Sequence, residues 1–328
     1  MRQRGRAHSA LRTAGRDTNA DAYTAAVMRL YRTVFRAMAS EHELQLWSDD
    51  EARARRAADA AIADVLRIEA KYSRYRDDSV TTRINCAAGG EAIAIDGETA
   101  ALLSYADRCY RQSGGRFDIT SGVLRRVWDF RSRPPRLPER AAIEAATALI
   151  GWDRVEWDDR RIRLPQAGMQ IDFGGIGKEY AADRAATLCA EHGIAHGLVN
   201  LGGDVRAIGP QPDGAPWRVG IRHPRREGAA IATVLLATGA VATSGDYERY
   251  FEIDGTRYCH LLDARTGQPT AYWQSVSVVS PLCVVAGSCA TIAMLLEGDA
   301  EAFLREQGLP YVAVDGNGAV RGSAAETA

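Results

Sequence analysis

Apolar residues recur at different spacings along the first half of the chain, and the spacing predicts the elements. Residues 34–47 alternate between apolar and polar side chains, which predicts a strand. Residues 49–72 carry apolar residues at helical spacing, and so do residues 98–113, which end in a Ser-Gly-Gly helix stop. The fold is therefore expected to begin near Tyr31, with a strand followed by a long amphipathic helix.

The second half of the chain alternates short elements with turn residues. A Pro-rich link at residues 133–138 precedes a predicted helix at 139–150 and a hairpin formed by 154–157 and 161–164. Helices are predicted at 178–192 and, strongly apolar and rich in small residues, at 282–296. Strand-like runs occupy residues 197–200, 217–221, 230–236, 250–253, 257–262 and 276–279. Strands in runs with helices between them predict an α+β fold of antiparallel sheets packed with helices.

The two ends of the chain lack this periodicity. Residues 1–30 begin with a polar, Arg-rich stretch and predict a flexible tail. Residues 31–320 are expected to form one domain with two intimate halves, and residues 321–328 a second tail. The chain of 328 residues suits such a single compact unit.

Composition and charge narrow the possible partners. The chain is 46% apolar and 25% charged, with a formal net charge of -1, so it has no overall field to hold nucleic acid or an anionic membrane. The N-terminal stretch lacks the apolar core of a signal peptide, and no run of residues has the apolar length of a membrane span. We therefore expect a cytoplasmic protein without nucleic-acid partners.

Cysteine and histidine positions do not indicate a metal cage. The six cysteines contain no CxxC pair, and buried free thiols are the favoured interpretation. His192 and His196 form the one histidine pair at helical spacing, but each is followed by glycine at a predicted helix end.

Residues 171–183 (IDFGGIGKEYAAD) carry the first candidate chemistry. Three glycines directly before a predicted helix let the backbone approach an anion closely, and Lys178 adds a positive charge in the first helical turn. A pyrophosphate would suit such a turn. The spacing matches neither a Walker loop nor a Rossmann fingerprint, so the run alone is a weak signal, and a plain strand-to-helix turn is the other open interpretation.

Four further segments combine polar groups with apolar or aromatic neighbours. Thr243 and Ser244 offer hydroxyl groups at a turn, and His260 lies in a predicted strand, where it is either a core residue or an acid, base or hydrogen-bond donor. Residues 116–122 and 72–79 mix aromatic and polar side chains, which suits a flat heteroaromatic ligand but is also common in ordinary loops.

In their order along residues 35–298, these segments resemble the ApbE family of FAD:protein FMN transferases. The matching segments are 35–38 (FRAM), 72–85 (YSRYRDDSVTTRIN), 115–124 (GRFDITSGVL), 171–183, 200–209 (NLGGDVRAIG), 243–247 (TSGDY) and 260–269 (HLLDARTGQP). The resemblance implies a T-fold-like core. It also implies an enzyme that cleaves FAD, attaches FMN through a phosphoester to a Thr or Ser of a client protein, and releases AMP with the help of a metal ion.

The resemblance also implies roles for individual residues. His260 and Lys178 are expected to be catalytic. Mg²⁺ would be held by the backbone carbonyl of Gly177 and the hydroxyl of Thr291. The residues expected to contact FAD are Met38, Tyr75, Phe117, Asp118, Ile119, Gly174, Lys178, Tyr180, Asp183, Thr243, Ser244, His260 and Leu262.

One position departs from the family pattern in a way that bears on the metal. Gly287 stands where the family has an Asp ligand, four residues before Thr291, so the anionic metal ligand is lost and Mg²⁺ binding is expected to be weakened or absent. Asp172 and Asp246 are candidates to compensate. Glu179, where many relatives have glycine, is a second departure that changes the charge near the phosphates.

Three functions remain open at this point. The first is FMN transfer to a client protein. The second is a non-catalytic FAD-binding or flavin-delivery protein, for which Gly287→Asp would create metal-dependent activity. The third is hydrolysis of FAD to FMN and AMP, with water in place of the client hydroxyl.

Overall fold

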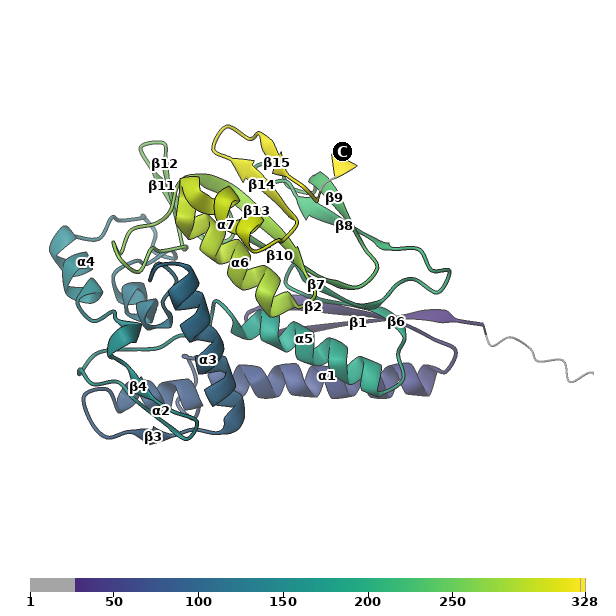
Figure 1. Ribbon diagram of the computed structural model, residues 1–328, viewed down its shortest axis with the longest axis horizontal. Helices are drawn as coiled ribbons and strands as arrows, with labels where there is room; N and C mark the ends of the chain where they lie inside the picture. The colour runs from purple at the N-terminus through teal and green to yellow at the C-terminus, as the bar shows by residue number, and fades with distance from the viewer. Residues whose placement is uncertain (1–26, 325, 328) are drawn as a thin grey trace, which may run out of the picture.

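The computed structural model describes residues 27–324 and 326–327, and most of the predicted N-terminal tail lies outside them. Its centre is an eight-stranded sheet in which every neighbouring pair is antiparallel (Figure 1). The strands, in order across the sheet, are β1 (Arg29–Ala37), β2 (Ser40–Ser48), β6 (His196–Leu201), β7 (Asp204–Gly209), β10 (Gly239–Gly245), β13 (Trp273–Ser280), β14 (Tyr311–Asp315) and β15 (Val320–Gly322).

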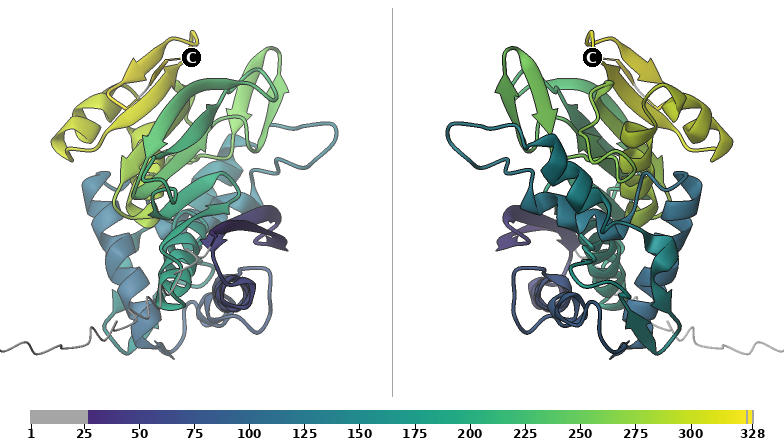
Figure 2. Two further views of the ribbon diagram at one scale, coloured as in Figure 1. Left: turned by 90° about the vertical axis from the view of Figure 1, so that its right-hand side faces the viewer. Right: turned by 90° about the vertical axis from the view of Figure 1, so that its left-hand side faces the viewer.

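The two faces of the sheet are covered by different layers (Figure 2). Ala240 and Ala242 of β10 pack into the main core with the helices α1 (Glu51–Tyr72), α5 (Gly177–Glu191) and α6 (Cys283–Leu296). Val241, between them, points to the other face and packs against β8 (Trp217–Arg222) and β9 (Ala230–Leu236), which form a small sheet with β16 (Glu326–Thr327). The period-two alternation of β10 thus builds a core on each side.

A smaller, mostly helical part lies at one end of α1 and α5 (Figure 1). Its elements are α2 (Val80–Cys86), β3 (Ile93–Ala94), α3 (Gly97–Gln112), the 3₁₀ helix η1 (Ile119–Arg126), α4 (Arg140–Thr147), η2 (Trp152–Arg154), β4 (Glu156–Trp157) and β5 (Arg161–Arg163). The remaining elements are the hairpin β11 (Tyr250–Ile253) and β12 (Thr256–Cys259), followed later by η3 (Glu297–Asp299) and α7 (Ala300–Glu306).

The predicted α+β fold of antiparallel sheets and helices is confirmed. The long helix after the first strand, the helix after the glycine run and the apolar helix near residue 282 are present as α1, α5 and α6. Residues 34–47 form parts of two strands instead of one, joined by a two-residue turn. The C-terminal residues expected as a tail include β16, which pairs with β9.

The helical stretch Cys283–Glu306 is the one candidate membrane span among the described residues, by length and composition alone. Its mean hydropathy is 1.4, and 61% of the window is buried inside the molecule, since α6 packs against β10 and β13. The sequence pattern did not predict a stretch of this length. All six cysteines are free, and all but Cys86 are buried, as expected for structural thiols.

Candidate functional site

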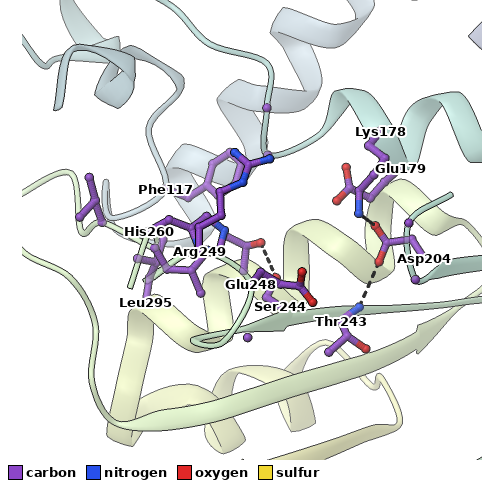
Figure 3. Close-up of a pocket in the computed structure, with 18 of the residues that line it drawn as sticks. Phe117, Lys178, Glu179, Asp204, Thr243, Ser244, Glu248, Arg249, His260 and Leu295 are labelled. Carbon is purple, nitrogen blue, oxygen red and sulfur yellow. Dashed lines mark hydrogen bonds and ion pairs between the residues drawn. The ribbon is translucent and has the colours of Figure 1, made fainter. Parts of the chain in front are cut away.

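A cavity of about 520 Å³ lies where the turns at one end of the sheet meet α5, α6 and the loop before η1. Figure 3 shows Lys178, Glu179 and Asp204 on one side of it, and His260, Arg249 and Phe117 on the other. Most of the predicted site residues line this cavity: Met38, Phe117, Asp118, Ile119, Gly174, Lys178, Thr243, Ser244, His260, Leu262 and Thr291. Segments from distant parts of the sequence therefore form one site.

Met38 reaches the cavity from the turn between β1 and β2. Met38 and Ala39 both have positive φ angles, 48° and 62°, as a two-residue type I′ hairpin turn requires. Such a turn usually contains Asn or Gly, because other residues are strained there. The backbone N–H of Met38 donates to Glu69 Oε1 at 2.7 Å, which helps to hold the turn against the cavity.

The loop before η1 is held by the buried carboxylate of Asp118. Asp118 Oδ1 accepts from the backbone N–H and the hydroxyl of Thr120, both at 2.7 Å, and Oδ2 accepts from the N–H of Trp152 at 3.0 Å. This arrangement holds Phe117 beside Gly175, where an added Cβ would lie 3.1 Å from the ring. Asp118 thus borders the cavity while its side chain stabilises the loop.

Lys178, at the start of α5, is half-buried and forms an ion pair with the buried carboxylate of Asp204. Lys178 Nζ lies 2.5 Å from Asp204 Oδ2, and Asp204 Oδ1 accepts from the backbone N–H of Thr243 at 3.2 Å. Burial alone would lower the pKa of Lys178, but the carboxylates of Asp204 and Glu179 outweigh it and raise the pKa. Lys178 is therefore a permanent cation on the cavity wall.

Glu179 is the other charged residue at the start of α5, and its carboxylate is poorly satisfied. The residue is only 8% exposed, and its Oε2 atom has no hydrogen-bond partner among the described residues. Burial, and then the negative charge of Asp204, raise the pKa of Glu179 to about 7. A Cβ at Gly287 of α6 would lie 2.5 Å from Glu179 Cγ, so the glycine leaves the space that Glu179 occupies.

Asp172 and Asp246, the acids expected to compensate for Gly287, are already paired with arginines. Asp172 Oδ2 lies 3.0 Å from Arg74 and 3.2 Å from Arg125, and these cations hold its pKa below the usual value despite burial. Asp246 accepts two bonds from Arg225, at 2.7 and 2.6 Å. Both carboxylates are therefore already paired with arginines that are distant in sequence.

The hydroxyl groups of β10 and α6 meet across the cavity wall. Ser244 Oγ and Thr291 Oγ1 lie 2.7 Å apart, and Thr243 Oγ1 lies 2.8 Å from Ser277 Oγ. Thr291 follows Gly287 by four residues, so the two positions share one face of α6. This face points towards the start of α5, where Glu179 lies against Gly287.

His260 follows β12 directly and is not part of the strand predicted for it. Its backbone N–H donates to the carbonyl of Arg249 at 2.9 Å, while its buried Nδ1 atom has no partner among the described residues. Burial, followed by the positive charges of Arg249 and Arg125, lowers its pKa to about 4. The imidazole is thus neutral at neutral pH and able to accept a proton.

Four of the residues expected to contact FAD or the metal do not line this cavity. Tyr75 is 74% exposed and borders a neighbouring cavity of about 680 Å³. Tyr180 donates to Glu98 at 2.8 Å, and Asp183 accepts from the first N–H groups of α6, because both point away from the cavity-facing side of α5. Gly177 is the buried first residue of α5.

Several arginines on the cavity wall were not predicted from the sequence, among them Arg125 and Arg249. Arg125 and Arg249 line the cavity near His260, and each also borders the neighbouring cavity that contains Tyr75. Arg125 comes directly after the motif at residues 115–124, which is a weak signal. Arg249 has no comparable signal, because only the folded loop brings it to His260.

Comparison with known proteins gives a consistent set of matches. The model of the ApbE family matches residues 38–313. FAD:protein FMN transferase from Vibrio cholerae is 31% identical over 69% of both chains, and that from Salmonella typhimurium is 33% identical over 72% of this chain and 70% of the relative. The crystal structure of the ApbE protein from Thermotoga maritima has a TM-score of 0.83 at 34% identity, covering 90% of this chain and 97% of that chain. The flavinyl transferase ApbE from Pseudomonas stutzeri, in its apo form, has a TM-score of 0.80 at 29% identity, covering 91% and 95%.

Proposed function

Because the chain belongs to the ApbE family, we propose that it transfers FMN from FAD to a Thr or Ser hydroxyl of a client protein and releases AMP. The observation that carries this proposal is that a neutral His260 and a cationic Lys178 line one cavity. Such a cavity offers both a proton acceptor and a positive charge to a pyrophosphate ester.

The walls of the cavity suit the parts of FAD. Met38, Phe117 and Leu262 provide apolar surface for a flat ring system. Gly174 and Gly175 leave the backbone open to the phosphates at the start of α5, next to Lys178. We propose that the pyrophosphate lies along this glycine turn.

The transfer requires one bond to form and one to break. The client hydroxyl oxygen bonds to the phosphorus of the FMN half, and the bond from that phosphorus to the bridging oxygen breaks, so that AMP leaves with that oxygen. His260 accepts the hydroxyl proton, for which its neutral form is required. Lys178 offsets the negative charge of the phosphates, and positioning supplies most of the remaining rate.

The residues present also fit a divalent cation bound together with the pyrophosphate. Within residues 27–324 and 326–327, no three His, Cys, Asp or Glu side chains form a metal cage, so phosphate oxygens would have to complete the coordination. Thr291 and the carbonyl of Gly177 are the neutral ligands, and an unpaired buried carboxylate lies beside Gly287. Mg²⁺ at this place would neutralise charge on the pyrophosphate.

The proposal is tested with purified chain, FAD, Mg²⁺ and a client that carries a flavinylation site. We expect the client to gain the mass of one FMN and an equal amount of AMP to appear, both strongly reduced in His260→Gln. FMN and AMP without client modification would instead show FAD hydrolysis. Intact FAD retained by the protein, with no products, would show a non-catalytic FAD-binding protein.

A further inference from the structure

Where α5 contacts α6, the side chain of Glu179 occupies the space beside Gly287, which has no side chain. Glu179 of α5 extends into space that any side chain on residue 287 would occupy, since a Cβ there would come within 2.5 Å of Glu179 Cγ and 3.0 Å of Glu179 Oε1. Real Cβ atoms are not found at the shorter distance. A carboxylate can therefore approach this point from α5 or from α6, but the two helices cannot both supply it.

The one cation beside Glu179 among the described residues is shared with a second carboxylate. Lys178, its neighbour in sequence, is paired with Asp204 at 2.5 Å. Glu179 Oε2 has no hydrogen-bond partner in the part of the chain that the structure describes, although the residue is more than nine-tenths buried. Burying an unpaired carboxylate is costly, so a residue kept in this state indicates a missing positive ligand.

Glu179 faces the cavity together with oxygen atoms that suit a hard cation. Thr291 and Ser244 line the same wall, and their hydroxyl oxygens lie 2.7 Å apart. Gly287 precedes Thr291 by one helical turn, so a carboxylate lying against Gly287 is presented close to the Thr291 face of α6. Magnesium commonly binds one or two carboxylates together with phosphate oxygens.

We propose that Glu179 supplies from α5 the carboxylate ligand that Gly287 cannot supply from α6, and that the two residues together preserve a divalent-cation site. This inference rests on the proposed function, because the cation is the one that would bind with the pyrophosphate of FAD. Gly287 is then a requirement of this site, since it makes room for Glu179.

The direct test is a titration of the FAD-loaded protein with Mn²⁺, followed by the electron paramagnetic resonance signal of free Mn²⁺. Glu179→Gln preserves the shape of the side chain and removes its charge. We expect it to weaken Mn²⁺ binding by about tenfold or more. An Mn²⁺ affinity within about twofold of the parent would show that Glu179 is only a packing residue and would overturn the proposal.

Asp246→Asn is the matched control, because it removes a second buried acid that already has arginine partners. We expect this variant to bind Mn²⁺ like the parent. If Asp246→Asn loses Mn²⁺ while Glu179→Gln retains it, the compensating acid is Asp246 and the proposal is wrong.

Moving the carboxylate back to α6 gives a second, independent test. Glu179→Gly alone should lose Mn²⁺ binding, and the double variant Glu179→Gly, Gly287→Asp should regain it to within about threefold of the parent. Gly287→Asp alone should unfold at a lower urea concentration than the parent, since its Cβ meets Glu179. A folded double variant that binds Mn²⁺ no better than Glu179→Gly would contradict the proposal that a carboxylate at either position serves the same site.

These measurements separate failure of this inference from failure of the proposed function. If Mn²⁺ binding depends on Glu179 but no client is flavinylated, the transfer reaction is wrong and the ligand assignment holds. If the client is flavinylated and Glu179→Gln still binds Mn²⁺ like the parent, only the ligand assignment fails.

Discussion

His260 is kept neutral by its surroundings, and this has a measurable effect on stability. Its pKa is about 4 in the folded protein and 6.5 in the unfolded chain, so between these values the unfolded state binds a proton that the folded state does not. The free energy of unfolding should therefore fall as the pH drops from 6.5 towards 4, by up to about 3 kcal/mol from this residue.

The His260→Gln variant isolates that effect, because it removes the titrating group and leaves the other acids in place. In urea unfolding at pH 7 and pH 5, the variant should gain stability relative to the parent at the lower pH. A stability difference that does not change between the two pH values would show that His260 is not depressed in pKa.

Gly175 offers a second test at the level of one residue. An added Cβ would lie 3.1 Å from the Phe117 ring, so Gly175→Ala should displace the ring from the cavity wall. We expect FAD affinity, measured by quenching of flavin fluorescence, to fall by about tenfold, while Gly97→Ala, where a Cβ meets no atom within 4 Å, leaves it unchanged. Equal FAD affinities of the two variants would show that Phe117 does not contact FAD.

The sequence was enough to identify several residues of the site, but not the residues with which they pair. The glycine turn, Lys178 and His260 are visible as local motifs, and all lie at the cavity. The direction of a side chain on a helix and its pairing across the fold are not local. For this reason Gly287 and Glu179 looked like two separate departures, and Gly287→Asp alone, expected to create metal-dependent activity under the non-catalytic interpretation, meets an occupied space.

At the level of elements, the N-terminus of α6 depends on a side chain from α5. Asp183 accepts from Cys283 N at 2.8 Å and Val284 N at 2.9 Å, while α6 has no side-chain cap of its own. Asp183→Ala should therefore lower the free energy of unfolding by about 2 kcal/mol, because it leaves these N–H groups unpaired.

The same helix carries Thr291, so Asp183→Ala should also weaken Mn²⁺ binding to the FAD-loaded protein. Arg140→Ala, which breaks an exposed pair with Glu144 on α4, is the control and should change unfolding by less than about 0.5 kcal/mol. If Asp183→Ala unfolds at the same urea concentration as the parent, Asp183 does not stabilise α6.

Helices with a clear pattern of apolar residues were predicted well. The ends of strands, which depend on pairing with other strands, were not. Regular apolar spacing was enough for α1 and α3, and a continuous apolar run was enough for α6. The split of residues 34–47 into β1 and β2 was missed, because Met38 and Ala39 form a tight turn without the usual Asn or Gly. His260 was placed in a strand because its neighbours are apolar, although β12 ends at Cys259.

For the whole molecule, ligand binding should appear as added stability. A ligand that binds only the folded state stabilises it by about 2.7 kcal/mol at a concentration one hundred times its Kd. We expect FAD with Mg²⁺ to raise the unfolding temperature measured by calorimetry, and riboflavin, which lacks phosphates, to raise it much less. Equal effects of the two compounds would argue against a pyrophosphate site at Lys178 and the glycine turn.

The fold class of the whole molecule followed from the sequence, but the order of strands did not. Runs of strands with helices between them indicated antiparallel sheets. The main sheet places β2 beside β6 and β7 beside β10, pairings that join segments far apart in the chain. Since the cavity lies where these distant segments meet, its full lining could not be predicted from local patterns.

We propose that FAD binds with its pyrophosphate and a divalent cation between the start of α5 and the Thr291 face of α6. A crystal structure with FAD and Mn²⁺, with Mn²⁺ located by anomalous scattering, tests it most directly. We expect an Mn²⁺ peak in direct contact with Glu179, Thr291 Oγ1 and the pyrophosphate, with Lys178 beside the phosphates. An Mn²⁺ ion held by Asp172 or Asp246, or FAD bound outside this cavity, would contradict it.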